Sequence, residues 1–239
     1  MPRYKVADII FDARLNYDYV EKLCKKYEYS GLEQPHFSVS ITDEDILNES
    51  VSDLYPKWYL ESLALFRKLC EYALNNADGL VFHSSAIMVD GNAYLFTAPS
   101  GTGKSTHTRL WREMLGDRAV MVNDDKPLIR YENGEFYIYG TPWNGKHHLD
   151  TDCKAKIKAI CHIYQNKENV ICKADKNKML VTILNQTIRP KDISSMDKLL
   201  GLIDKLLTTV DIYSLGCNIS REAAELSFNT MSGANKNEN

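Results

Sequence analysis

The stretch that most constrains the fold of this chain is residues 98–106, Ala-Pro-Ser-Gly-Thr-Gly-Lys-Ser-Thr. It follows an apolar run at residues 93–97 and precedes a predicted helix at residues 106–115. Gly103, Lys104 and Ser105 match the end of the motif G-x-x-x-x-G-K-[ST], and Ala98 replaces its first glycine. The alternative is a glycine turn before an ordinary helix, but such a turn does not require a lysine followed by two hydroxyl side chains. The pattern therefore predicts a phosphate-binding loop between a strand and a helix.

Each part of this loop has an expected role in holding a nucleotide. Gly101 and Gly103 let backbone N–H groups turn toward an anion, and the helix adds its positive N-terminal end. Lys104 would reach the terminal phosphates, and the hydroxyl of Ser105 or Thr106 would bind a magnesium ion that accompanies them. The expected nucleotide-binding residues are Ser100, Gly101, Thr102, Gly103, Lys104, Ser105 and Thr106.

Two adjacent aspartates, Asp124 and Asp125, follow a buried strand expected at residues 119–122. In proteins with such a loop, an aspartate at the end of a neighbouring strand assists magnesium binding. A pair allows one carboxylate to hold magnesium while the other accepts the proton of an attacking hydroxyl. The alternative is a polar strand end that caps a turn.

Composition excludes several classes of function. The chain has 239 residues, a 44% hydrophobic fraction and a net charge of −3, so nucleic acid is not expected as a main partner. No apolar run is long enough to span a membrane, and the first residues lack the apolar core of a signal peptide. The six cysteines are scattered, which is typical of reduced thiols. We therefore expect a cytoplasmic protein without a zinc site.

The order of elements predicts an α/β fold with a mixed sheet. Turn signals at residues 90–92 and 133–134 join neighbouring strands as hairpins, which an all-parallel sheet would not contain. We expect three parts, residues 1–78 packed on the core, a phosphate-loop domain at 79–231 and a disordered tail at 232–239. Strands are expected at residues 4–14, 80–88, 93–97, 119–122, 127–131, 136–139, 157–164, 169–173 and 212–215, and helices at 15–30, 57–75, 106–115, 177–187, 194–210 and 220–231.

His83, residues 98–105 and residues 122–125 together resemble the core of the HPr kinase/phosphorylase family, whose P-loop fold is shared with phosphoenolpyruvate carboxykinases. Residues 140–146 and 213–218 are similar to small relatives described as carboxykinase-like or HPr kinase-related. The resemblance covers approximately residues 80–220. It implies a mixed β-sheet P-loop domain with flanking helices, magnesium and ATP as cofactors, and phosphoryl transfer to a hydroxyl, usually that of a serine.

The resemblance also implies roles for individual residues. Asp124 would be the base, Asp125 would bind the metal together with Ser105, and His83 and Lys104 would lie near the transferred phosphate. Without the resemblance, His83 on an apolar strand would be typical of a core histidine with satisfied hydrogen bonds.

The acceptor site is expected in the loop at residues 140–148, which carries Trp143, Asn144 and Lys146. The alternative for Trp143 is packing over the sheet edge. Arg189 would stabilise transition-state charge, or else be an ordinary surface arginine.

These features predict an ATP- and magnesium-dependent kinase that acts on a hydroxyl of a peptide, small protein or small molecule. The alternative is a nucleotide-binding sensor or ATPase with no phosphoryl acceptor. Adjacent aspartates favour transfer, because a pure binder needs only one. The acceptor, the use of ATP or GTP, reversal of the reaction and assembly into a homo-oligomer stay open at this point.

Overall fold

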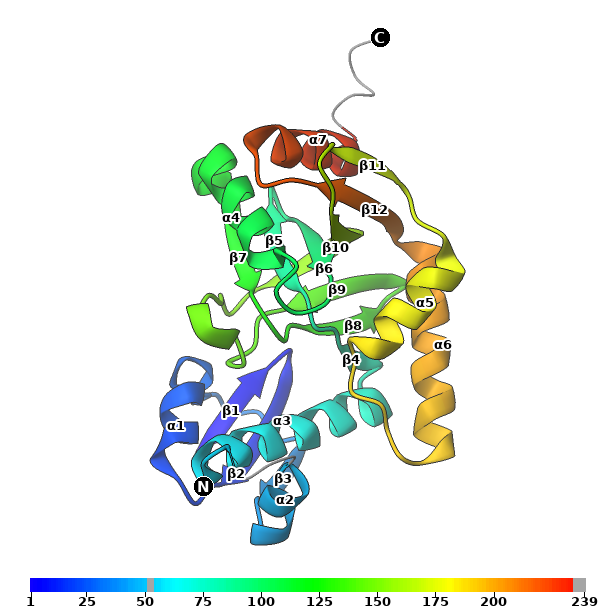
Figure 1. The fold of residues 1–239 in the computed structure, drawn as a ribbon. Coiled ribbons are helices and arrows are strands. Elements are labelled where there is room, and N and C mark those ends of the chain that lie inside the picture. Colours follow the sequence, from blue (N-terminus) through cyan, green and yellow to red (C-terminus); the bar gives the residue numbers. More distant parts are fainter. Residues whose placement is uncertain (51–53, 234–239) are drawn as a thin grey trace.

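A computed structural model describes residues 1–50 and 54–233 of the chain as an α/β fold built on a mixed sheet (Figure 1). The strand order is β4-β8-β9-β10-β6-β5-β7, and β12 pairs with both β10 and β11. Strand β10 runs parallel to β6 and β12 but antiparallel to β9, so the predicted mixed sheet is confirmed. The strands are β4 (Gly79–Val81), β5 (Ser85–Val89), β6 (Asn92–Thr97), β7 (Ala119–Asn123), β8 (Leu128–Glu132), β9 (Glu135–Tyr139), β10 (Lys154–Gln165), β11 (Val170–Lys173) and β12 (Asp211–Cys217).

Both predicted hairpins are present. Asp90 and Gly91 join β5 to β6 with φ angles of 49° and 80°, and Asn133 and Gly134 join β8 to β9 with φ angles of 51° and 86°. Two successive positive φ values match the right-handed twist of the strands that they connect. The hairpin signals in the sequence were therefore sufficient to place these strands.

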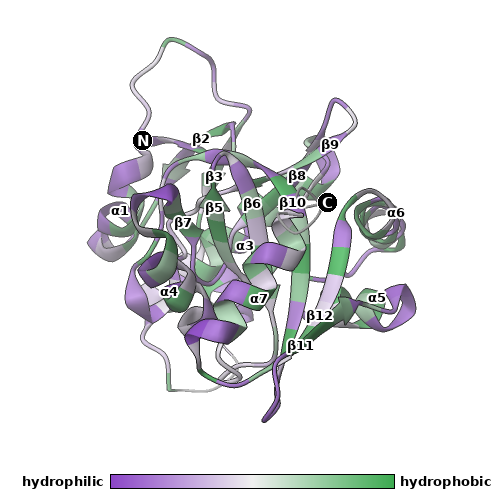
Figure 2. Ribbon diagram, turned by 90° about the horizontal axis from the view of Figure 1, so that it is seen from above, coloured by the Kyte–Doolittle hydropathy of each residue, from purple (hydrophilic) through white to green (hydrophobic). Residues whose placement is uncertain are grey.

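Helices cover both faces of the sheet (Figure 1). The residues of β6 alternate, with Tyr94 and Phe96 packed in the core beneath α4 and α7 and Leu95 in the core beneath α5 and α6. Figure 2 shows the hydrophobic colour concentrated on central strands such as β5 and β10. The four helices are α4 (Lys104–Leu115), α5 (Lys176–Asn185), α6 (Ile193–Thr209) and α7 (Arg221–Ser232).

The first part of the chain forms a second, smaller sheet, β1-β2-β3, beside the long helix α3. The buried carboxylate of Glu61 on α3 accepts hydrogen bonds from the backbone N–H groups of Asn16 (2.6 Å) and Tyr17 (3.0 Å). One hydrophobic core contains residues of this sheet, of α3 and of β4 and β8, so α3 packs against both sheets. The elements are β1 (Arg3–Val6), β2 (Ile9–Arg14), α1 (Asp18–Cys24), β3 (Phe37–Ser40), α2 (Asp43–Asn48) and α3 (Lys57–Asn76).

Four expectations need revision or stay open. The strand expected at residues 80–88 is two strands, because the chain changes partners: the N–H of Phe82 bonds to Pro127, and that of His83 bonds to Gln186. The strand expected at residues 4–14 is the hairpin of β1 and β2. Ser232, expected in the tail, ends α7, and the rest of the predicted tail from residue 234 lies outside the described residues. The domain boundary at residue 78 stays a prediction.

The helix that follows the glycine-rich loop is fixed to α7 by a buried polar cluster. The Nε2 atom of His107 lies 2.8 Å from Oγ of Ser227, which also accepts a hydrogen bond of 2.9 Å from the indole N–H of Trp111. All three side chains are buried. Burial lowers the pKa of His107 to about 4, so the ring is neutral at pH 7.

This histidine should make stability depend on pH. The unfolded chain takes up a proton at His107 near the ordinary pKa of 6.5, whereas the folded protein resists protonation down to about 4. Stability is therefore complete above pH 6.5, and about 2 kcal/mol of unfolding free energy is lost between pH 7 and 5. Urea unfolding as a function of pH measures this loss of unfolding free energy in the wild type and in His107→Gln. The glutamine keeps a polar group opposite Ser227. A pH slope that is identical in the two proteins would contradict the assignment.

Candidate active site

The loop at residues 98–103 leaves the end of β6 and leads directly into α4, as predicted. Gly101 and Gly103 have φ angles of 79° and 120°, which residues with side chains rarely adopt. Gly103 is also the N-cap of α4, and no side chain caps this helix end. The first N–H groups of α4 are consequently available to an anion.

Lys104 is almost fully buried rather than extended into solvent. Its side chain folds back so that Nζ donates a 2.9 Å hydrogen bond to the carbonyl of Ala98, and the residue is 8% exposed. Burial lowers the pKa of Lys104, while the nearby charges of Asp125 and Asp124 act in the opposite direction. The ammonium is thus held at the loop, within the field of both carboxylates.

The sheet brings three chain segments together at this loop. Because β6 and β7 both run antiparallel to β5, the ends of β6 and β7 and the start of β5 lie at the same edge. The loop, His83 just before β5 and the two aspartates just after β7 therefore meet. Residues expected from the sequence to act together are close in space for this topological reason.

Asp124 faces α4. Its Oδ1 atom accepts a 2.5 Å hydrogen bond from Oγ of Ser85, and that hydroxyl lies 2.8 Å from Oγ1 of Thr108 on α4. Asp124 is 8% exposed, and Ser85 and Thr108 are fully buried. This carboxylate is thereby fixed next to the first turn of α4, on the side of the phosphate loop.

Asp125 instead pairs with His83. Its Oδ1 atom lies 2.8 Å from Nδ1 of His83, and its Oδ2 atom lies 2.8 Å from Nζ of Lys126. Burial raises the pKa of Asp125, but the hydrogen bond from His83 and the charge of Lys126 outweigh it and bring the net pKa below the ordinary value. With Nδ1–H directed at the carboxylate, a neutral His83 ring keeps its lone pair on Nε2.

Asn123 holds this arrangement in place, and the sequence analysis missed it. Its Oδ1 atom accepts hydrogen bonds of 2.8 Å from the backbone N–H groups of both Asp125 and Lys126. Its Nδ2 atom donates to the carbonyl and the hydroxyl of Thr141 at 2.9 and 3.2 Å. Asn123 is fully buried. An asparagine just before two aspartates at a strand end is the only signal that could have indicated this role.

The loop at residues 140–148 packs over the aspartate turn. A Cβ atom built on Gly145 would lie 3.0 Å from Cβ of Asp125, and Gly145 itself has a φ angle of 69°. Asn144 is 8% exposed and donates a 2.6 Å hydrogen bond to Asp150, and Lys146 is exposed in the short turn η3 (Gly145–His147). The loop therefore supports the site, and Lys146 is its exposed cation.

Trp143 is packed against the long helix α3. It is 5% exposed, its indole N–H donates a 3.0 Å hydrogen bond to the carbonyl of Ser62 on α3, and its ring centroid lies 4.6 Å from that of Phe66. These contacts favour the alternative of a packed tryptophan, and contact of Trp143 with an acceptor stays a prediction. The long helix α3, distant in sequence, is what buries it.

Trp143→Ala should accordingly cost stability. Removing a buried indole and its hydrogen bond is expected to lower the unfolding free energy by about 3–5 kcal/mol. Urea unfolding measures the loss, and Trp58→Ala, at a tryptophan that is 40% exposed, is the control with a smaller expected effect. Unchanged stability combined with a selective loss of acceptor use would restore the sequence-based assignment.

Two pockets border the site from opposite sides. The first, here called the α4 pocket, has a volume of about 500 Å³ and is lined by Thr102, Gly103 and apolar residues such as Leu110 and Ile163. The second, here called the α3 pocket, has a volume of about 420 Å³ and is lined by His83 and Asp125 together with residues of α3. The phosphate loop thus borders one pocket, and the His83–Asp125 pair borders the other.

Arg189 lies elsewhere. It is exposed and lines a third pocket, between α3 and the segment before α6, whereas His83 and Asp125 line the α3 pocket. Arg189 thus lines neither of the two pockets beside the site, and its role in stabilising transition-state charge stays a prediction. Among the described residues, no group of three or more His, Cys, Asp or Glu side chains forms a metal cage. In the same part of the chain, no helix combines the length and apolarity needed to cross a membrane.

No protein family model matches the chain, and no curated protein matches it. Among solved structures, the Hpr(Ser) kinase/phosphatase from Coxiella burnetii matches with a TM-score of 0.37 and 9% sequence identity. The match covers 66% of this chain and 99% of that chain. A likeness at this level does not establish membership of that family, so we infer function from the site itself.

Proposed function

We propose that this protein is a magnesium- and ATP-dependent kinase that transfers a phosphoryl group to an alcohol. The observation that carries the proposal is the position of the His83–Asp125 pair beside the phosphate loop, with a pocket opening on the pair. A nucleotide-binding sensor would need the loop but neither the oriented histidine nor this pocket.

The residues present fit a nucleotide with magnesium. The uncapped start of α4, the left-handed glycines and the ammonium of Lys104 together offer donors and positive charge to phosphates. Apolar residues of the α4 pocket suit a nucleobase beside that loop. Ser105 and Asp124 would hold the magnesium, and the missing metal cage is no obstacle because magnesium in such sites is bound largely by phosphate oxygens and water.

When bound, magnesium-ATP supplies the phosphoryl group and an electrophilic phosphorus. Lys104 and the N–H groups of α4 then stabilise the negative charge that develops on the phosphate oxygens. Nε2 of His83 would take the proton of the acceptor hydroxyl as the hydroxyl oxygen bonds to the terminal phosphorus and the bond to the leaving ADP breaks. The carboxylate of Asp125 would orient the ring and stabilise its protonated form.

This division of labour differs from the one expected from the sequence, in which Asp124 is the base and Asp125 a metal ligand. Asp125 lines the α3 pocket together with His83. Asp124 is turned toward α4 and accepts a hydrogen bond from Ser85. The contacts of the two carboxylates therefore favour Asp124 for the magnesium side and the His83–Asp125 pair for the proton.

The decisive experiment is a transfer assay. The protein is incubated with magnesium and ATP labelled on the terminal phosphate, together with serine peptides, free hydroxy-amino acids and polyols. We expect label in at least one alcohol. Label that appears only as inorganic phosphate, at a rate that no acceptor changes, would instead indicate a hydrolase or a sensor.

A further inference from the structure

The α3 pocket does not end at His83. It adjoins the third pocket, of about 490 Å³, and the two pockets share the lining residues Glu49, Arg67, Val81, Thr187 and Ile188. One wall is α3 and the other is the segment between α5 and α6. The two pockets therefore form one groove that begins at the His83–Asp125 pair and passes Arg67.

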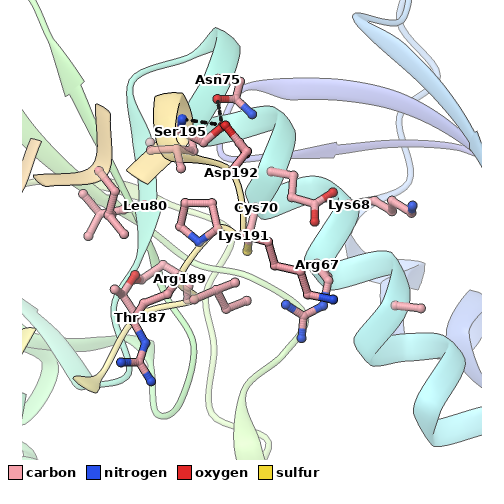
Figure 3. Close-up of a pocket in the computed structure, with 18 of the residues that line it drawn as sticks. Arg67, Lys68, Cys70, Asn75, Leu80, Thr187, Arg189, Lys191, Asp192 and Ser195 are labelled. Carbon is pink, nitrogen blue, oxygen red and sulfur yellow. Dashed lines mark hydrogen bonds between the residues drawn. The ribbon is translucent and has the colours of Figure 1, made fainter. Parts of the chain in front are cut away.

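Positively charged side chains lie on both walls beyond this pair. Arg67 comes from α3, while Arg189 and Lys191 come from the opposite segment (Figure 3). Arg67 pairs with Glu49 through Nε and Nη2, its side chain is 41% exposed, and Nη1 has no hydrogen-bond partner among residues 1–50 and 54–233. Arg189 and Lys191 have neither a hydrogen bond nor an ion pair with any described residue.

The acidic residues of the groove are largely committed to other contacts. Asp45 pairs with Lys68 and caps α2, Glu49 pairs with Arg67, and Asp192 caps α6 through the N–H of Ser195. Glu71, exposed on α3, is the remaining carboxylate. The groove is thus left with two unpaired cations and one further guanidinium N–H group, on two facing walls.

Arg189 and Lys191 are exposed and hold no fixed carboxylate among the described residues, so both can turn toward an anion in the groove without breaking an existing ion pair. We propose that the acceptor is bifunctional, with a hydroxyl that reaches His83 and an anionic group that binds Arg67, Arg189 and Lys191. A carboxylate or a phosphate satisfies this chemistry, because guanidinium groups bind both in a bidentate manner. That this ligand is the phosphoryl acceptor rests on the proposed kinase function. The anion site itself does not depend on that function.

Matched pairs of probes test the anion site. The small pair is glycerate and its neutral amide, glyceramide, and the peptide pair has one serine flanked by glutamates or by glutamines. In transfer assays we expect kcat/KM to favour the charged member by about tenfold, which corresponds to about 1.4 kcal/mol. The pair that shows the preference distinguishes a small acceptor from a peptide.

The double variant Arg189→Gln/Lys191→Gln should bring the ratio of the two kcat/KM values close to one. Lys22→Gln/Lys158→Gln, which removes two exposed lysines on α1 and β10, is the charge-matched control and should keep the preference. A preference that survives in the groove variant, or no preference in the wild type, would overturn the inference.

A binding assay separates this inference from the proposed function. Fluorescence anisotropy with the labelled glutamate peptide, and calorimetry with glycerate, need no ATP. If either probe binds the wild type and not the groove variant but no phosphate is transferred, the anion site stands and the kinase function fails. Transfer to neutral and charged alcohols with equal efficiency leaves the kinase function and removes the anion site.

Discussion

Lys104→Ala should abolish measurable binding of magnesium-ATP, with at least a 100-fold loss of affinity. The ammonium of Lys104 lies at the start of α4, is held there by the carbonyl of Ala98, and supplies the positive charge of the loop. In a largely buried site, loss of a charge-assisted hydrogen bond to phosphate reduces the binding free energy by about 3 kcal/mol or more. Isothermal titration calorimetry measures the affinity directly.

The fold must be shown to survive this change. The buried ammonium leaves only one carbonyl without its partner, so we expect a loss of unfolding free energy of about 1–2 kcal/mol, which circular dichroism and urea unfolding will detect. Lys158→Ala, at an exposed lysine of β10, is the control and should bind as the wild type does. Unchanged affinity in a folded Lys104→Ala protein would remove the phosphate-loop assignment.

Local patterns in the sequence were enough to predict most elements of the sheet and its helices. Some elements depend only on the backbone conformation of a few neighbouring residues, so the local sequence reveals them directly. Examples are the loop at Gly103 and Lys104 and the hairpin turns at Gly91 and Gly134. The break between β4 and β5 could not be predicted in this way. Residues 80–88 are apolar on both sides of His83, Ser84 and Ser85, and this short polar stretch does not by itself indicate a change of strand. Distant partners, such as Gln186, fix where the chain leaves one strand and enters the next.

The candidate site shows the same limit. The sequence pointed to Lys104 and both aspartates through their places after a glycine-rich loop and a buried strand, and to His83 only through the resemblance to a known family. It could not assign the two aspartates, since their roles depend on Ser85 and His83, which lie about 40 residues away along the chain. It also placed Trp143 at the acceptor, because nothing near position 143 reveals the helix that buries its ring.

The first part of the chain supports the site from a distance. Asp150, close to the loop over Asp125, accepts hydrogen bonds from Lys26 (2.9 Å) and Tyr27 (2.8 Å), which follow α1. The same loop is tied to α3 through Trp143 and Ser62. Changes in this part of the chain should therefore affect the aspartate turn as well as the wall of the α3 pocket.

The second large effect is expected at the pair that takes the proton. His83→Gln should reduce turnover by about 100- to 10,000-fold while sparing nucleotide affinity, since general-base contributions lie in this range. Asp125→Asn should also reduce turnover, because the amide no longer stabilises the protonated ring. Initial rates with labelled ATP, measured beside calorimetric affinities, separate the loss of turnover from a loss of binding.

The split between turnover and nucleotide affinity distinguishes this pair from Asp124. Although burial raises the pKa of Asp125, the hydrogen bond from His83 and the charge of Lys126 lower it overall, so this carboxylate is ionised at neutral pH and can orient the ring. Asp124→Asn, on the magnesium side, should instead weaken magnesium-dependent nucleotide binding, which calorimetry with and without magnesium measures. If Asp124→Asn abolishes turnover at unchanged nucleotide affinity and His83→Gln retains the wild-type rate, Asp124 is the base and the His83–Asp125 pair is not.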